Sequence, residues 1–470
     1  MLSELLKVGD PLPFHKDYEA EKTRRAFWRL SFAGGSKYKD GKDASNRDIF
    51  IQHEQESPAG KMRRLSLSVY KNYCKPITQK YNDFVFTSAI ERDKDNAAFT
   101  EWAKNVDTLG TPLHDFIKKS TLWAAVEKNR YVLFDTTKTA EVVNQAQAKQ
   151  SKAQVFMVDI AADAVVNHVI VNGALSEALV FFEERSEARL YTETDYQTIQ
   201  LKENQIISIS PAVKHPWGGI PVVKASAVCG LESDSSMLED IAEINKSIFN
   251  MDAMLREELA NQTFSQWALF GVKKDDMDEA EVSYNARKFL CIAHKDASAV
   301  RLAADVSQAQ SIRDTIKGDV QEIYRLAGLH APEVQEQGAE SGRALKIRWN
   351  DVEMTAASIA DHAEKFENNC IKLWSAGMGG SEVQPTDYPE EFDTEEIVDS
   401  LKITLDMLGS QLPFTLKRLQ VEEFAKKKFP KMEEDDAREF MKELLAVKDQ
   451  QEEQRVAEVE ATKGIGKMAP

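Results

Sequence analysis

The chain has few cysteines and no long apolar run. Its four cysteines, Cys74, Cys229, Cys291 and Cys370, lie far apart and form no CxxC pair, which excludes the common zinc and thiol-redox motifs. They are expected to be free, buried thiols. Nowhere do about eighteen apolar residues follow one another, so no membrane-spanning helix is expected. The N-terminal stretch also lacks the basic start, apolar run and cleavage site of a secretory signal.

An excess of positive charge is absent as well. The 470 residues include 60 Lys and Arg against 77 Asp and Glu, and the formal net charge is −17. A tight grip on nucleic acid needs clustered basic side chains that neutralise phosphates. The composition therefore argues against a tight nucleic-acid binder, but it is compatible with a surface past which DNA slides.

Three stretches begin like known catalytic or metal-binding motifs, but each lacks a residue or a spacing that the motif requires. The stretch "GSKYKDGKD" from Gly35 has the wrong spacing for a phosphate-binding loop. "HEQES" at His53 lacks the second imidazole of a zinc metalloprotease, because Ser57 stands there. "DKDNAAFTE" from Asp93 has Ala97 where a calcium loop needs an oxygen ligand. No enzyme activity, cofactor, metal site or catalytic residue is therefore predicted.

Periodicity divides the first half of the chain. The apolar spacing over 61–86 predicts a helix with Pro76 as a kink or break. Between Val155 and Ser210 the period changes to two, and the runs "VFMVDI", "VVNHVIV", "ALVFFEE", "EARLYTET" and "YQTIQL" predict an antiparallel β-lobe. The lobe ends in "HPWGGIPVV", a turn rich in glycine and proline.

Three long helices are predicted in the second half, over 236–262, 307–329 and 343–374. Their apolar residues recur every three or four positions, which places one apolar stripe on each helix. On the last helix, about 48 Å long at 1.5 Å per residue, the stripe is Leu345, Trp349, Val352, Ala356, Ile359, Ala363, Phe366 and Cys370. Ser236 and Glu239 predict a capping box at the first helix.

The segments between and after these helices differ in character. Three β-like runs lie in 263–306, and a polar, acidic loop with almost no large apolar residue occupies 330–342. Residues 381–400 contain eight acidic and no basic residues. That segment fits either a cation or basic partner, or a solvated face.

The order of these parts resembles the portal proteins of tailed bacteriophages, the head-to-tail connectors. The resemblance is carried by "HPWGGIPVV", then helix, small insert, helix and polar loop, then "ESGRALKIRW" leading into the long helix, and "LGSQLPFTLKRL" after it. It covers most of the chain. It implies an α+β, predominantly helical fold with wing, stem, clip and short crown, assembled as a ring.

The resemblance also implies domain boundaries and partners. The segments would be a wing (1–235), stem helices (236–262 and 307–329), a clip (263–306), a tunnel loop (330–342), a tunnel-side helix with a return to the wing (343–400), and a crown and tail (401–470). The implied partners are eleven further copies in a homo-oligomer of 12, double-stranded DNA bound without sequence specificity, the terminase large subunit, the major capsid protein and a head-tail adaptor. No membrane partner is implied, and the location would be the virion, with the host cytoplasm during assembly.

Two sets of residues are assigned roles on this basis. Residues expected to face DNA in the channel are Glu333, Gln335, Glu336, Gln337, Glu340, Ser341, Arg343 and Lys346. Residues expected to pack subunits together in the stem are Ile241, Ile244, Ile248, Ile312 and Ile316. Three alternatives stay open: another helical adaptor or scaffold, a cytoplasmic enzyme whose site is too dispersed to recognise, and an ordinary surface connection in place of the tunnel loop.

Overall fold

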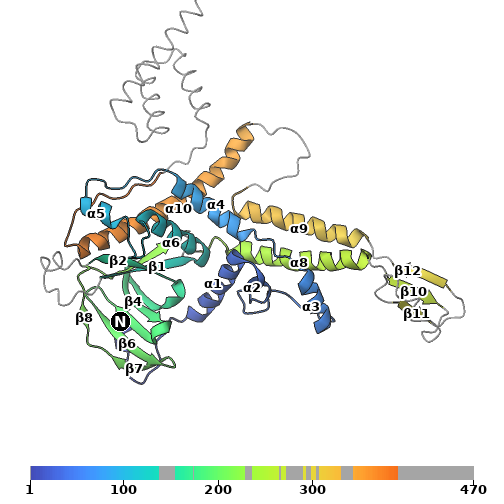
Figure 1. The fold of residues 1–470 in the computed structure, drawn as a ribbon, viewed down its shortest axis with the longest axis horizontal. Coiled ribbons are helices and arrows are strands. Elements are labelled where there is room, and N and C mark those ends of the chain that lie inside the picture. The colour runs from blue at the N-terminus through green and yellow to red at the C-terminus, as the bar shows by residue number, and fades with distance from the viewer. Residues whose placement is uncertain are drawn as a thin grey trace, which may run out of the picture. The chain divides into compact units, whose positions relative to one another are not determined.

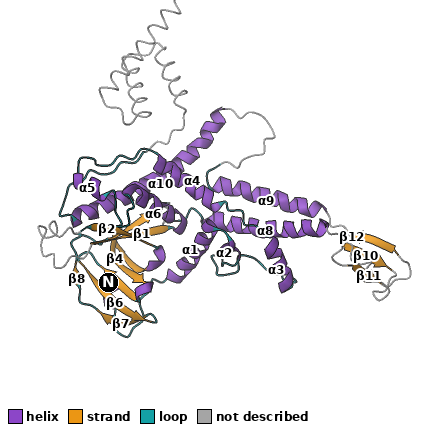
Figure 2. Cartoon of the chain, in the orientation of Figure 1, coloured by secondary structure: helices purple, strands orange, loops and turns teal. Residues whose placement is uncertain are grey.

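The computed structural model describes residues 2–136, 154–172, 174–227, 235–263, 266–270, 289–292, 298–302, 306–329 and 342–389. In these residues helices combine with three β-sheets, an α+β fold (Figures 1 and 2). Most of the predicted tunnel loop, residues 390–400 of the acidic segment and the whole predicted crown lie outside the described residues.

The β-lobe is an antiparallel sheet of six strands. Its strands are β3 (Val165–Val171), β4 (Ala174–Phe182), β5 (Glu187–Tyr191), β6 (Asp195–Lys202) and β7 (Gln205–Ile209), paired in chain order, with β8 (Val213–Lys214) on β6. The strand β7 was not among the predicted runs. Four of the five predicted runs lie in this sheet, and the fifth, "VFMVDI", belongs to another.

That fifth run is β2 (Val155–Ile160), which pairs with β1 (Asn129–Thr136), and β1 pairs with β9 (Val222–Ser226). Apolar residues of this second sheet and of one face of the β-lobe form a common core. The opposite face of the β-lobe is covered by the chain's first eighteen residues, which contribute Leu2, Leu6, Leu12 and Tyr18. Strand β4 is buried on both faces for this reason, and its central residues read as a continuous apolar run.

The first part of the chain also forms helices, and α6 packs on β1 and β9 of the second sheet. The helices are α1 (Tyr18–Ala33), α2 (Ser36–Lys39), α3 (Pro58–Leu67), α4 (Cys74–Thr87), α5 (Ala97–Trp102) and α6 (Leu113–Glu127). The helix predicted over 61–86 is two helices, α3 and α4. Pro76 does not separate them, because it lies in the first turn of α4, where a backbone N–H has no partner to lose.

Helices α8 (Glu239–Thr263) and α9 (Val306–Leu326) pack side by side (Figure 1). Between them the chain forms a small sheet of β10 (Gln266–Phe270), β11 (Phe289–Ile292) and β12 (Ser298–Leu302). Strand β10 is central, parallel to β11 and antiparallel to β12. Ser236 does not form the expected capping box: its hydroxyl donates to the Val126 carbonyl (2.7 Å) and accepts from the Leu238 N–H (3.0 Å).

Helix α10 (Gly342–Gly377) is 36 residues long and packs against α4, α6 and β9. The predicted stripe is buried from Val352 to Cys370. At its end Gly377 lies against the Trp217 ring from the "HPWGGIP" turn, and a Cβ on residue 377 would overlap that ring. The turn and the long helix can therefore approach this closely only because Gly377 has no side chain.

Candidate functional site

The predicted stem residues lie in the α8–α9 pair of a single chain. Ile241, Ile248 and Ile316 are buried there, whereas Ile244 and Ile312 are half-buried. Helix α8 packs against α9 and also against α1, α3 and α4, so the burial of these isoleucines is accounted for by contacts within one chain. Whether they also contact a neighbouring subunit stays a prediction.

Helix α8 has a second buried face, which is polar. Asn245 is fully buried, and its Oδ1 accepts from the Tyr73 N–H (3.1 Å) and the Tyr70 hydroxyl (3.2 Å). Its Nδ2 donates to the Lys71 carbonyl at 2.9 Å. One amide side chain thus satisfies three groups of the segment before α4. Satisfied buried polar groups fix one arrangement, because any shift leaves several of them unpaired.

Further along the same face, Lys246 donates to Asp43 and to Glu243, each at 2.8 Å. Burial by itself lowers the pKa of Lys246, but these two carboxylates outweigh it and the pKa is raised. Asn250 donates to the Ile49 carbonyl (2.9 Å) and accepts from the Ile51 N–H (2.9 Å). Helix α8 is therefore fixed to residues 43–73 along most of its length, which leaves a narrow exposed strip that includes Ser247 and Met254.

Helix α10 is fixed by a buried ion pair. Glu367 is fully buried and accepts from Arg92 through Nε (2.6 Å) and Nη2 (2.9 Å). The hydroxyls of Tyr388 (2.7 Å) and Thr386 (3.1 Å) donate to the same carboxylate. Burial lowers the pKa of Arg92, but the bonds to Glu367 more than offset this and the pKa is raised. The pair holds the middle of α10 between the segment before α5 and the residues that follow α10.

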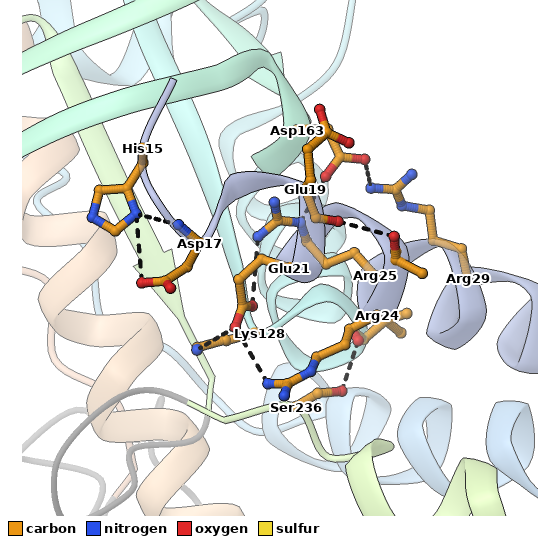
Figure 3. Close-up of polar contacts among 12 residues, drawn as sticks. His15, Asp17, Glu19, Glu21, Arg24, Arg25, Arg29, Lys128, Asp163 and Ser236 are labelled. Atoms are coloured by element: carbon orange, nitrogen blue, oxygen red, sulfur yellow. Dashed lines mark hydrogen bonds and ion pairs between the residues drawn. The ribbon is translucent and has the colours of Figure 1, made fainter. Parts of the chain in front are cut away.

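A third cluster of charges joins α1 to the sheets. Arg25 donates to Asp163 at 2.6 Å, and Arg29 contacts both Asp163 and Glu127. Figure 3 shows Arg25 and Arg29 of α1 directed toward Asp163, which lies in the short turn η2 (Ala162–Ala164) between β2 and β3. Arg130 of β1 also donates to Glu127, at 3.0 Å. Each carboxylate here serves more than one guanidinium, which is the arrangement expected of a structural joint.

Two of the eight predicted channel residues, Arg343 and Lys346, lie in the first two turns of α10. The other six predicted channel residues lie outside the described residues. Sequence reasoning missed the anchoring residues Asn245, Lys246, Asn250, Arg92 and Glu367. For Asn245, Lys246, Asn250 and Glu367 the only signal was the presence of polar residues on helices whose apolar stripes were already complete. Arg92 lies in the segment before α5, where no such pattern singles it out.

The described residues hold no group of three or more His, Cys, Asp or Glu side chains placed to bind a metal. Cys74 and Cys370 are buried free thiols, and burial raises the pKa of both. The Nε2 of His215 donates a hydrogen bond to the Thr192 carbonyl at 3.0 Å. Among the described helices, none combines the length and apolar character that crossing a membrane requires.

Comparison with known proteins gives weak likenesses. No family model and no curated protein matches the chain. Among solved structures it is similar to the neck of a native GTA particle computed with C12 symmetry, with a TM-score of 0.40 and 9% identity over 89% of this chain and 96% of that one. It is also similar to the neck of an empty GTA particle computed with C6 symmetry, with a TM-score of 0.38 and 9% identity over 89% of this chain and 97% of that one. Because both TM-scores lie below 0.5, these likenesses do not establish a shared fold.

Proposed function

We propose that the chain is the subunit of a portal, a homo-oligomeric ring of twelve copies through which double-stranded DNA enters and leaves a phage capsid. The ring has no enzymatic activity of its own and works with the terminase large subunit, the major capsid protein and a head-tail adaptor. The observation that carries the proposal is the small separate sheet inserted between two helices that pack against each other. A sheet of three short strands is stable only where an apolar face is packed against something, and neighbouring copies in a ring would cover such a face.

The anchoring of α8 supports this assignment. A stem helix of a ring transmits force between the insert at one end and the body of the subunit at the other. Asn245, Lys246 and Asn250 bind the helix to residues 43–73 by hydrogen bonds and an ion pair. This attachment resists sliding better than apolar packing does, because each polar contact has one geometry.

The predicted tunnel residues follow from the same assignment. The chain runs from the end of α9 through 330–341 to the start of α10, so these residues connect the stem to a helix that Arg92 fixes to the body. In the proposed ring they face DNA in the narrowest part of the channel. Their acidic charge repels phosphate and lets the duplex slide without a base-specific grip.

The first test is the mass and symmetry of the purified protein. The proposal expects a closed ring of twelve copies of the 53.0 kDa chain by mass photometry, and a central channel in negative-stain images viewed along the axis. A monomer with measurable turnover of a substrate would support the enzyme alternative and overturn the proposal. Open filaments or solid bundles would support a different helical scaffold.

A second test concerns the loop. Deleting residues 335–338 is expected to leave rings intact, because the apolar stripes of α9 and α10 are untouched, yet to impair packaging or retention of DNA. Replacing Glu336 and Glu340 with Lys is expected to make the channel bind duplex DNA with an affinity that falls as salt rises. If both variants assemble and package DNA like the parent, the loop does not face DNA.

A further inference from the structure

We infer that exposed and half-buried lysines in and between α2, α3 and the start of α4 form a second, peripheral DNA-binding surface, distinct from the proposed channel. The inference rests on the proposed function only in taking duplex DNA as the polyanion that the protein meets. It is based on a local excess of basic residues in a chain that is acidic as a whole. Residues 34–80 contain ten Lys and Arg against five Asp and Glu, within a chain whose net charge is −17. Residues 57–82 contain six basic residues and no acidic one.

The fold brings these residues together. Lys39 of α2 donates from Nζ to the Ser68 carbonyl just after α3, at 2.6 Å. The Tyr38 ring stacks on the Tyr70 ring with centroids 3.8 Å apart. These contacts join α2 to the segment between α3 and α4, and Figure 1 shows α3 on the side of α8 away from α9. We call the resulting surface the lysine surface; its members are Lys37, Lys39, Lys42, Lys61, Lys71 and Lys75.

Most of its charge is not neutralised within the chain. Lys42 (2.6 Å) and Lys61 (3.3 Å) share one carboxylate, Asp48, whose pKa is held low by their hydrogen bonds. Lys71 shares Asp252 with Arg256. Lys39 is bonded to a neutral carbonyl. Two cations on one carboxylate leave a net positive charge at each place, and Lys37 and Lys75 are exposed as well.

The chemistry of the surface favours a nucleic-acid backbone over an acidic peptide. Its six members are lysines, which act as hydrated point charges and contact phosphates without demanding one orientation. Recognition of a carboxylate or phosphate in one fixed orientation uses the planar fork of arginine. Arg64 is already bound by Glu56 at 2.7 Å and Arg47 by Asp43 at 3.3 Å, so neither offers a free fork to a partner. A sequence-independent contact with the phosphates of duplex DNA fits this composition.

The test compares two double charge reversals of equal size. Lys37→Glu with Lys75→Glu alters two exposed members of the lysine surface, whereas Lys202→Glu with Lys214→Glu alters two exposed lysines of the six-stranded sheet. Binding of a labelled short duplex of arbitrary sequence is followed by fluorescence anisotropy between about 50 and 200 mM salt. The first variant is expected to make the slope of log K against log salt less steep by about 2, because each lost phosphate contact contributes about 0.9 to its magnitude. Its binding at the low-salt end is expected to be at least tenfold weaker than that of the parent. The control is expected to bind like the parent.

Three results would overturn the inference: no duplex binding by the parent, equal loss in both variants, or a polyglutamate competitor that displaces the duplex at equal charge concentration. The last result would assign the surface to an acidic protein. Ring formation is measured on the same samples. If rings form but do not bind duplex DNA at this surface, only this inference is contradicted. If no rings form, the proposed function is contradicted.

Discussion

Removing the Glu367 carboxylate is expected to be among the most damaging single changes in α10. The side chain is fully buried and accepts four hydrogen bonds, two of them from Arg92. Glu367→Ala leaves the guanidinium without its counter-charge and two hydroxyls without an acceptor. Breaking a buried pair in this way costs about 3–5 kcal/mol, because the remaining charge stays desolvated. Arg92 retains 19% exposure of its side chain, so the lower half of that range is expected.

Urea unfolding followed by tryptophan fluorescence measures this cost. Trp374 of α10 stacks on Trp102 with ring centroids 5.3 Å apart, so the emission reports on the attachment of the helix. The matched control is Asp361→Ala, an exposed position on the same helix, which is expected to change stability by no more than about 0.5 kcal/mol. Combining Glu367→Leu with Arg92→Met is expected to be less damaging than Glu367→Ala alone, because no unpaired charge remains.

The reasoning would be refuted if Glu367→Ala unfolded at the same urea concentration as the control. It would also fail if the double variant were as unstable as the sum of two single losses. In the first case the ion pair would contribute nothing to holding α10. In the second case the loss would come from packing and not from an uncompensated charge.

Three further predictions concern the helix pair, the glycine contact and pH. Ile244→Asp is expected to destabilise the monomer by about 1–3 kcal/mol, since it puts a charge at a half-buried position of α8, whereas Ser247→Asp on the exposed strip should leave the monomer intact. Equal stability of the two variants in urea would argue against the packing of Ile244. Gly377→Ala is expected to cost about 1–3 kcal/mol and to shift the near-UV signal of Trp217, and an unchanged melting temperature would contradict the close approach. Burial and the neighbouring Arg92 guanidinium lower the pKa of His114 in the folded chain. As pH drops below about 6.5, the unfolded chain therefore binds this proton before the folded chain does, and the free energy of unfolding falls. His114→Gln is expected to flatten that part of the pH profile of stability, measured by thermal unfolding.

The sequence alone predicted four strands of the β-lobe and the three long helices α8, α9 and α10. Period-two alternation in 165–202 gave the strands of the β-lobe, and spacings of three and four gave the stripes of α8, α9 and α10. These signals are local: they depend on which side of an element is apolar, and that is written within ten to twenty residues. The order of elements, and with it the resemblance to portal proteins, was available for the same reason.

The partners of those elements came only from the tertiary structure. Strand β2 looked like the first strand of the β-lobe but pairs with β1, because alternation does not specify a neighbour. The buried polar face of α8 was invisible for the same reason, since Asn245 finds its partners more than 170 residues earlier. Arg92 and Glu367 lie 275 residues apart, and nothing in either local sequence indicates the other. A periodic pattern reports burial, whereas the identity of a hydrogen-bond partner depends on where the rest of the chain packs.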